Sequence, residues 1–468
     1  MGGWQKGFLR YSSANLKEKA FRSSTAHQEC VLLLLVYVFV FLTLLYAWLA
    51  HSPGATLINT IAIFATVTTT TGGAHLLIGR KRPVIDPFLL PSITCLIGLG
   101  LIMLERLAPN FLAKQLLWCI SGMIGLVVVI RCPRNLRWLR RYRYLWLLLG
   151  LFLLGLTFLF GVNPLGGSAR LWLGLGGMYF QPSEFLKLAF IVFLASYLAE
   201  KQELIRLTHS RVGNWTLPPL AYLTPLLLVW GLTLLLLIAQ QDLGTGALIF
   251  CTFLAMLYVT SQQVFYIVGG IVAFALTGAL GYAVSPFVAL RIDIWLDPWS
   301  RSEGAGYQIV QALLSFAAGG LFGTGLGHGH GATYIPIVHT DFVFAAIGEE
   351  FGLVGAVAVM LIYILLLYRG FRIALSATSP FDQLLAVGLT VSICLQAWVI
   401  MAGNLKMLPL TGVTLPFVSY GGSSLLSSCL AVALLLHISA RSTVQSNRNA
   451  LFARVARESL ANGSPALE

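Results

Sequence analysis

The sequence predicts an all-α integral membrane protein, a polytopic helical bundle of about twelve transmembrane helices. Hydrophobic residues make up 57% of the 468 residues and charged residues only 10%, whereas soluble domains carry about 25% charged residues. Apolar runs of about 18 residues or more recur along the chain, and a run of that length can cross a bilayer as a helix. The composition therefore excludes a soluble protein.

The chain begins with a polar, basic leader at 1–29, and the first span is expected at 30–50. A cleaved signal peptide is the alternative for this segment. The charged leader is long for a signal peptide and 46–50 offers no small-x-small cleavage site, so we interpret the span as a retained helix. The other spans are expected at 55–79, 87–104, 113–131, 143–161, 183–199, 217–239, 243–260, 264–285, 342–368, 383–403 and 422–440.

Basic residues are distributed unequally between alternate loops. The loops on one side of the predicted bundle, together with both termini, contain 23 of the 30 Lys and Arg residues. Cytoplasmic loops carry the excess of Lys and Arg, which predicts that both termini are cytoplasmic and that the large loop at 286–341 is extracytoplasmic. We interpret the net charge of +13 as a topology signal, with contact to anionic lipids as an addition. No nucleic acid is expected as a partner.

Motifs that suggest cofactor or metal sites in soluble proteins lack the necessary context here. The seven cysteines form no CxxC pair and lie in or beside apolar spans, so we interpret them as core residues. The glycine-rich run at 319–327 lacks the Lys-Ser/Thr ending of a phosphate loop and follows no βα unit. His328 and His330 have no third ligand at a recognisable spacing. The glycines are expected to allow tight turns and close packing.

The richest polar stretch lies at 286–350, where the long loop meets the tenth span. It concentrates arginines, carboxylates and hydrogen-bonding side chains, including Arg291 and Asp341, in a chain that is otherwise mostly apolar. Polar groups held at membrane depth are costly and usually mark a functional site. This stretch is therefore the first candidate for a substrate site.

A second outward loop enters the sixth span through residues 180–187. Pro182 suits the first turn of a helix, and Ser183 and Glu184 can serve the exposed backbone amides there. Lys187 follows Glu184 by three residues, so an ion pair across one turn is available. The sequence leaves open whether Lys187 is paired structurally or contacts an anionic ligand.

Two more outward stretches carry polar groups. Asp242, in the short turn between the seventh and eighth spans, either caps the next helix or lines a polar cavity. Residues 404–424 are rich in Gly and Pro, and interrupted backbone at membrane depth is tolerated where it lines a cavity or is buried in protein. Its free N–H groups and hydroxyls suit an anion.

Five short strings recur on the outward side. They are FQPSE at 180–184, DLGT at 242–245, GYQ at 306–308, HTDF at 339–342 with GEE at 348–350, and LPFVSYGGS at 415–423. In this order and on one side, they resemble the SEDS family, the RodA, FtsW and SpoVE group of bacterial cell-wall proteins. The resemblance spans 87–440 and implies a ten-helix catalytic core. It leaves 1–86 as a basic leader with two additional helices, and 441–468 as a basic cytoplasmic tail.

The resemblance implies a peptidoglycan glycosyltransferase at the outer face of the bacterial plasma membrane. Such enzymes polymerise lipid II, in cell elongation or division, and release undecaprenyl diphosphate. The family's essential aspartate falls on Asp341, which would take the proton from the acceptor 4-hydroxyl in a single displacement that inverts the anomeric carbon. The alternative for Asp341 is a helix N-cap on the tenth span.

The resemblance further places the substrate-binding residues in these same stretches. They are Arg170, Trp172, Gln181, Glu184, Lys187, Asp242, Arg291, Tyr307, Gln308, Gln311, His339, Thr340, Lys406, Ser419, Tyr420, Gly421, Gly422 and Ser423. The basic members would hold the charge of the diphosphate, and a divalent cation, Mg²⁺ or Mn²⁺, is left open as a helper. The implied partner is a class B penicillin-binding protein, a transpeptidase with one membrane helix.

The chain departs from the family pattern at Leu171, at 337–338, at Thr411 and at Gln241, so elongation and division are not distinguished. Two other functions remain as alternatives. One is a lipid II flippase or other lipid-linked transporter, suggested by charged residues in spans and by broken helices. A carrier should show polar residues through both leaflets, whereas the polar residues here cluster on the outer side. The other is a non-catalytic scaffold for a transpeptidase.

Overall fold

The computed structural model describes residues 2–50, 52, 55–79, 85–132, 136–163, 170–207, 210–212, 215–217 and 220–461. Eleven helices in that part of the chain are long and apolar enough to cross a membrane, and Thr224–Ala239 forms a shorter apolar helix. The prediction of an all-α polytopic membrane protein is confirmed. The basic run at 80–82 and residues 167–169 lie outside the described residues.

Every expected span is occupied by helix, but α1, α7 and α18 extend beyond their spans into the predicted leader, the loop after 199 and the tail. Two precede the core: α1 (Gly2–Leu49) and α2 (Leu57–Gly79). The core helices are α3 (Leu89–Leu107), α4 (Leu112–Arg131), α6 (Arg143–Phe160), α7 (Pro182–Leu207), α8 (Leu220–Ala239), α9 (Leu243–Ser261), α10 (Val264–Val284), α16 (Gly352–Ser376), α17 (Pro380–Asn404) and α18 (Gly422–Ala461).

Short elements connect these helices. The short helices are η1 (Pro109–Phe111), α5 (Arg137–Arg141), α11 (Pro286–Leu296), η2 (Trp299–Arg301), α12 (Tyr307–Gly319), α13 (Gly331–Tyr334), α14 (Val338–Asp341) and α15 (Val343–Glu350). Strands β1 (Gly161–Val162), β2 (Trp172–Leu175) and β3 (Met178–Phe180) form one antiparallel sheet in sequence order, with Leu173 opposite Phe180. Strands β4 (Ser210–Val212) and β5 (Trp215–Leu217) form a separate antiparallel hairpin. The sequence analysis did not predict these two sheets.

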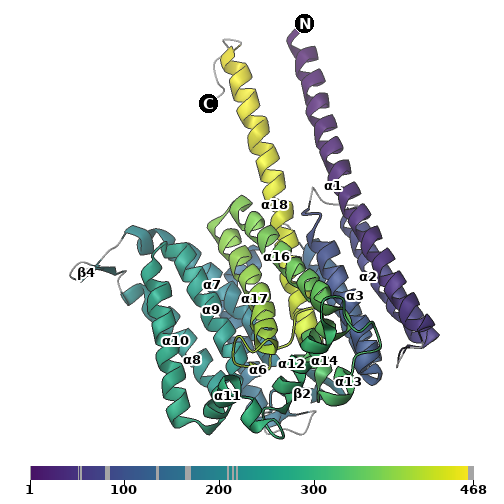
Figure 1. The fold of residues 1–468 in the computed structure, drawn as a ribbon. Coiled ribbons are helices and arrows are strands. Elements are labelled where there is room, and N and C mark those ends of the chain that lie inside the picture. The colour runs from purple at the N-terminus through teal and green to yellow at the C-terminus, as the bar shows by residue number, and fades with distance from the viewer. Residues whose placement is uncertain are drawn as a thin grey trace.

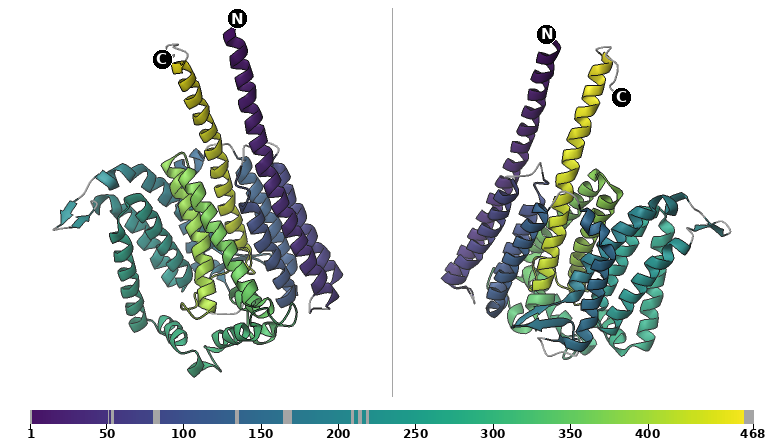
Figure 2. Two further views of the ribbon diagram at one scale, coloured as in Figure 1. Left: turned by 45° about the horizontal axis from the view of Figure 1, so that its top comes forward. Right: turned by 180° about the vertical axis from the view of Figure 1, so that it is seen from behind.

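The bundle has two distinct ends. Both termini project from the same end, on the long helices α1 and α18 (Figure 1). The opposite end carries α11 to α14 and the sheet of β1 to β3, and the views from other sides agree (Figure 2). We call these the terminal end and the site end. The separation places the outward strings of the sequence at a single end of the molecule.

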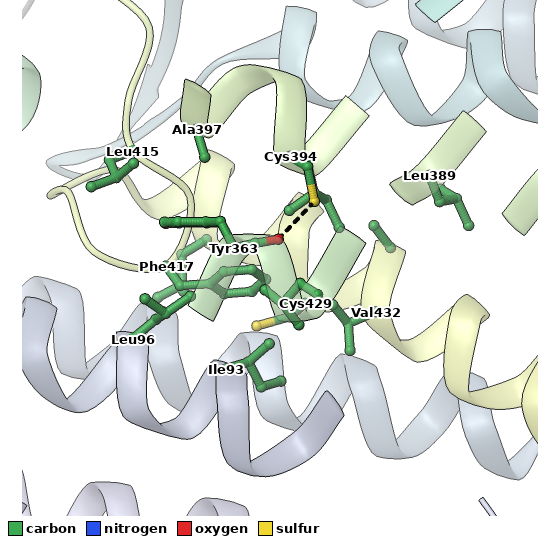
Figure 3. Packing of buried hydrophobic residues seen from close by; sticks show 14 of the residues in the cluster. Ile93, Leu96, Tyr363, Leu389, Cys394, Ala397, Leu415, Phe417, Cys429 and Val432 are labelled. Atoms are coloured by element: carbon green, nitrogen blue, oxygen red, sulfur yellow. Dashed lines mark hydrogen bonds between the residues drawn. The ribbon is translucent and has the colours of Figure 1, made fainter. Parts of the chain in front are cut away.

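The interior is a cluster of buried, mostly apolar side chains centred on α3, α16, α17 and α18. Tyr363 is fully buried in it, and its hydroxyl donates to the carbonyl of Pro416 at 2.5 Å. The thiol of Cys394 donates to the backbone carbonyl of Tyr363, and Phe417 and Cys429 lie close by (Figure 3). Cysteines 119, 394 and 429 are buried and free, which confirms the core interpretation for these three. Cysteines 95, 132 and 251 are partly buried. For Cys30 the interpretation is wrong, because it is exposed on α1.

One expected span is broken. The sequence predicted a continuous helix over 342–368, but α15 ends at Glu350 and α16 starts at Gly352. Gly352 has φ +66°, and a Cβ there would lie 2.3 Å from the backbone nitrogen of Gly323 and 2.5 Å from the carbonyl of Leu321. The break exists because the glycine-rich segment packs directly against this turn, which no apolar run reveals.

The two additional helices form a hairpin that packs against the core. Tyr37 of α1 and Thr71 of α2 share a hydrogen bond of 2.8 Å, and His75 faces Glu29 at 3.2 Å. At the site end, the hydroxyl of Ser52 donates to the carbonyl of Leu326 at 3.4 Å. The hairpin therefore reaches the glycine-rich segment of the long loop.

Candidate active site

Asp341 is the last residue of the short helix α14, at the site end of the bundle. Two bonds join this helix to the broken stretch after α17. The backbone nitrogen of Tyr420 donates to the carbonyl of His339 at 2.9 Å, and the hydroxyl of Ser419 donates to the carbonyl of Thr340 at 2.5 Å. Two strings that lie about 80 residues apart in the sequence are therefore held side by side.

The carboxylate of Asp341 and the guanidinium of Arg291 both approach the Cβ position of Gly412. A Cβ at Gly412 would lie 3.9 Å from Asp341 Oδ2 and 4.0 Å from Arg291 Nη2, so both groups border the same glycine. Burial raises the pKa of Asp341 to about 6, against the opposing influence of the Thr340 hydrogen bond and the charge of Arg291. A carboxylate with a pKa near neutrality is suited to accept and return a proton.

The alternative role of Asp341 as a helix cap is wrong. The N-cap of α15 is Phe342, and the side chain of Asp341 does not accept a bond there. Asp341 instead ends the preceding helix α14, whose own N-cap is Ile337 at φ +58°. Its carboxylate is therefore not engaged by the start of α15.

Arg291 comes from α11, which leads into the long loop. One of its nitrogens donates to the carbonyls of Leu410 and Thr411 at 3.2 and 3.3 Å, and its guanidinium lies 4.5 Å from the ring centre of Phe287. Burial lowers the pKa of Arg291, while Asp341 and Asp242 raise it. An arginine starts from a pKa above 12 and stays charged. It is thus a cation held by backbone carbonyls and influenced by the charges of two carboxylates.

A second polar cluster surrounds Asp242. The hydroxyl of Ser183 donates to its Oδ2 at 3.0 Å, and the backbone nitrogen of Thr245 donates to its Oδ1 at 3.2 Å. Asp242 therefore caps α9, which confirms one of the two roles predicted for it. It also accepts a hydrogen bond from Ser183 of α7. Gln181 completes the cluster, because its side chain donates to Ser183 at 3.0 Å and its backbone donates to Ser423 at 2.9 Å.

Lys187 and Glu184 form a buried ion pair of 2.9 Å. The ammonium of Lys187 also donates to Gln396 at 2.6 Å, and Ser427 donates to Glu184 at 2.8 Å. Pro182 begins α7, as predicted. The sequence left two roles open for Lys187, an ion pair within the protein or contact with an anionic ligand. The structure shows the ion pair, so Glu184 already balances the charge of Lys187.

An aromatic group borders Asp341 on the side of α4. The ring of His339 stacks on Phe111 at 5.0 Å between centroids, and Tyr420 lies 4.9 Å from Phe111. Burial lowers the pKa of His339, which favours the neutral imidazole. Gln115 bonds to the backbone of Ser419 and Gly421, at 3.5 and 3.4 Å. Sequence reasoning missed Phe111 and Gln115, because neither belongs to a recognisable string.

The glycine-rich segment is bound by two carboxylates of α15. Glu349 accepts from the backbone nitrogens of His330 and Gly331 at 2.7 and 2.9 Å. Glu350 accepts from Gly327 at 3.1 Å and pairs with Arg106 at 3.2 Å. These acidic residues fix the loop to the bundle and are not steps in a path through it.

Comparison with known proteins decides the family. Residues 93–444 match the model of the cell cycle protein family of FtsW, RodA and SpoVE. The chain belongs to this family. Among its relatives are the peptidoglycan glycosyltransferase RodA of Mycobacterium tuberculosis H37Rv and stage V sporulation protein E of Bacillus subtilis 168. RodA is 38% identical over 79% of this chain and 81% of its own length, and the sporulation protein is 36% identical over 70% and 87%.

Solved structures of the family have the same fold. A chain from a study of how a peptidoglycan synthase complex coordinates polymerization and crosslinking aligns with a TM-score of 0.64 and 27% identity, over 77% of this chain and 98% of that one. The crystal structure of RodA from Thermus thermophilus aligns with a TM-score of 0.55 and 27% identity, over 76% and 97%. The predicted family is therefore confirmed by sequence and by structure.

This member of the FtsW, RodA and SpoVE family brings only part of the predicted site together. Arg291, His339, Thr340, Ser419 and Tyr420 gather around Asp341, while Gln181, Asp242 and Ser423 form the second cluster. Gly421 bonds to Gln115, and Gly422 packs against Trp118. Lys406 has φ +57°, and its carbonyl accepts from Trp295 at 3.1 Å.

The other predicted residues are placed by backbone and loop contacts. Gln308 donates to the carbonyl of Pro336 at 3.2 Å, which ties α12 to the segment before α14. Trp172 begins β2, opposite Val162, and Arg170 is exposed just before it. Within the described residues, no hydrogen bond or ion pair joins Tyr307, Gln311, Trp172 or Arg170 to either cluster.

The donor set does not form a metal site of its own. Across the described part of the chain, no group of three or more His, Cys, Asp or Glu side chains is arranged to hold a metal ion. Arg291 is a basic side chain that borders the same glycine as the Asp341 carboxylate. The described residues therefore form no multi-ligand metal site, and a divalent cation at the diphosphate stays a prediction to which no chemical step is assigned.

Proposed function

We propose that this protein polymerises lipid II into peptidoglycan glycan strands at the outer face of the bacterial plasma membrane, in elongation or division. The observation that carries the proposal is Asp341, a carboxylate with a pKa of about 6 that borders Gly412 together with Arg291 at the site end of a family member. Relatives named peptidoglycan glycosyltransferase, 38% identical to this chain, support the activity.

The reaction follows from the two groups that border Gly412. Asp341 takes the proton from the acceptor 4-hydroxyl as that oxygen bonds to the donor's anomeric carbon. The bond from the anomeric carbon to the diphosphate breaks, and its electron pair leaves with undecaprenyl diphosphate. One displacement at an α-linked donor inverts it to a β-1,4 link. A single carboxylate suffices because diphosphate is a good leaving group, unlike the sugar alcohol in glycosidases.

The charge of the departing diphosphate requires cations near Asp341. Arg291 is the best placed of the predicted basic residues, because its guanidinium shares the space beside Gly412 with the catalytic carboxylate. Lys187 is less suited to this role than the sequence suggested, because Glu184 and Gln396 already bind its ammonium. Arg170 and Lys406 remain proposed contacts to the same diphosphate.

The transporter alternative is disfavoured by the terminal end of the bundle. There Asp86 pairs with Arg369, and Asp382 pairs with Arg441 at 2.9 Å. These pairs join α16 and α18 to neighbouring segments where a carrier would need to open. The polar clusters described above lie at the site end, so no polar path through both halves of the membrane is built from them.

The partner we propose is a class B penicillin-binding protein, which would crosslink the strands that this protein makes. A solved relative belongs to a peptidoglycan synthase complex that coordinates polymerization and crosslinking, and that finding supports a transpeptidase partner. Both the enzyme and the scaffold would bind such a partner, so only dependence on Asp341 separates the two alternatives.

The test is polymerisation of labelled lipid II by the purified protein, alone and with its cognate transpeptidase, comparing wild type with Asp341→Asn. We expect loss of glycan chains, by roughly 10²-fold or more, because the amide cannot accept the proton. Asp297→Asn is the matched control: Asp297 is an exposed carboxylate in the same loop that binds only nearby backbone nitrogens. Addition of EDTA and of Mg²⁺ to each reaction tests the metal independently.

Equal polymer from wild type and a folded, partner-binding Asp341→Asn would contradict the assignment of the base and favour the scaffold. Loss in both Asp341→Asn and Asp297→Asn would point to a general effect of charge in the loop. Movement of lipid II across vesicle membranes without polymerisation would favour the transporter.

A further inference from the structure

Asn404 is a fully buried amide at the last turn of α17, and all its polar atoms are used. Its Nδ2 donates to the backbone carbonyl of Asp341 at 2.8 Å and to that of Ile400 at 3.0 Å. Its Oδ1 accepts from the backbone nitrogen of Ala345 at 3.3 Å. The amide has one consistent orientation, because reversing it would set an oxygen against two carbonyls.

These contacts bridge the junction between α14 and α15. The first backbone nitrogens of a helix lack partners within it, and the N-cap of α15 is Phe342, whose side chain cannot supply one. Asn404 supplies the missing acceptor from a different helix. The same side chain holds the carbonyl of Asp341, one residue before that junction.

We propose that Asn404 is a positioning residue for Asp341, which sets the direction of its carboxylate relative to the reacting hydroxyl. The inference rests on the proposed role of Asp341 as the base. It is distinct from substrate binding, because Asn404 is 0% exposed and touches the backbone of Asp341, not the space beside Gly412.

The physical basis is a two-point fixation of the backbone. Ser419 holds the carbonyl of Thr340 at 2.5 Å and Asn404 holds the carbonyl of Asp341 at 2.8 Å. With both peptide planes fixed, the Cα–Cβ bond of Asp341 has one direction. Loss of the Asn404 donor leaves one plane free to rotate, and a displacement of about 1 Å at a catalytic group can cost roughly 100-fold in rate.

Two variants separate this role from helix capping. Asn404→Asp keeps the size of the side chain and the acceptor for Ala345, but it replaces the donor to Asp341 with a second oxygen. Asn404→Ala removes both functions. Ser379→Ala is the matched control, because Ser379 caps the opposite end of the same helix by accepting from Asp382 at 3.1 Å. It weakens α17 without contacting Asp341.

The experiment measures kcat, KM and the pH profile of lipid II polymerisation, with Tm as the measure of folding. We expect both Asn404 variants to lose about 100-fold in kcat with KM little changed. We also expect Asn404→Asp to move the acid limb of the profile to higher pH, because its carboxylate lies beside Asp341. Ser379→Ala should lower Tm while keeping kcat and the acid limb. If Asn404→Ala does not fold, Asn404→Asp decides.

Wild-type kcat and an unchanged acid limb in Asn404→Asp would overturn the inference. So would an equal fall of kcat in Ser379→Ala, which would mean that helix stability alone controls the rate. Asp341→Asn is measured beside them: if it is inactive while the Asn404 variants are normal, only the positioning role fails. If Asp341→Asn is active, the proposed function fails as well.

Discussion

At the scale of single residues, the site is governed by how one carboxylate is kept both buried and usable. Asp341 is half-buried, and burial disfavours its charged form, while Arg291 and the Thr340 hydroxyl favour it. The balance leaves its pKa at about 6. An ordinary aspartate, with a pKa of about 3.9, would be a weaker base at neutral pH.

The pH dependence of polymerisation should report this balance. Asp341 accepts a proton only when ionised, so kcat/KM should be level above pH 6 and fall about tenfold per pH unit below it. Arg291 lowers the pKa of Asp341, so Arg291→Gln should move the acid limb to higher pH and also raise KM. The measurement is kcat/KM for lipid II across pH 5 to 8.

If the acid limb of the kcat/KM profile lies at the same pH in Arg291→Gln as in the wild type, the charge of Arg291 does not act on Asp341. The matched control is Arg301→Gln, which removes a more exposed arginine of the same loop that pairs with Asp293 at 3.3 Å. That change should leave the limb where it is in the wild type.

At the scale of elements, the long loop is organised by backbone contacts to carboxylates. Gly323, Gly325 and Gly327 have φ of +85°, +97° and +86°, values that favour glycine. The expectation that these glycines serve tight turns and close packing is confirmed. Glu349 and Glu350 then hold this segment against α15 by accepting hydrogen bonds from its backbone nitrogens.

Glu349→Ala should loosen this segment locally. Hydrogen bonds to a charged group contribute about 1.5–3 kcal/mol each, so loss of those from His330 and Gly331 should speed amide exchange there by about 10- to 100-fold. The measurement is hydrogen exchange of the intact protein in detergent or nanodiscs. Asp297→Ala, which frees Trp299 and Ser300, should speed exchange only at those residues.

Exchange at 330–331 that matches the wild type in Glu349→Ala would show that packing, and not the carboxylate, holds the segment. Faster exchange throughout the chain would show instead that the variant is globally destabilised.

The elements show how far sequence reasoning reaches. Apolar runs predicted the spans, because hydropathy is a local signal. Short sequence strings, through the family resemblance, predicted which residues belong to the site. The break at Phe351 was missed because hydropathy continues across it. The contact between Asn404 and Asp341 was missed because it joins residues 63 apart. The pairing of Lys187 with Glu184 was one of two alternatives that the sequence left open, because it lies within one turn. The bond from Ser183 to Asp242 was not predicted.

At the scale of the whole molecule, all candidate chemistry lies at the end opposite both termini (Figure 1). The excess of Lys and Arg in the termini and alternate loops predicts that the terminal end faces the cytoplasm. The site end would then face outward, where the substrate is polymerised. Orientation is thus a condition for the proposed function.

Cysteine labelling tests this orientation in intact cells. Glu303→Cys, exposed in the long loop, should react with a membrane-impermeant maleimide, while Arg140→Cys, exposed on α5, should react only after the membrane is opened. The parent chain with its seven native cysteines gives the background. The reverse pattern would place the site in the cytoplasm and contradict the proposal.

The α1–α2 hairpin lies outside the family match, yet it packs closely against the core. Gly98 of α3 leaves no room for a Cβ, which would lie 2.6 Å from Val40 of α1. Glu105 is 2% exposed and lines a small cavity together with Ser52, in the turn of the hairpin, and Arg106. Without the hairpin, this face of α3 would lose its protein contacts, and Glu105, near the end of the helix, would lose its cover. The hairpin therefore covers a face of the core with protein contacts that lipid does not reproduce.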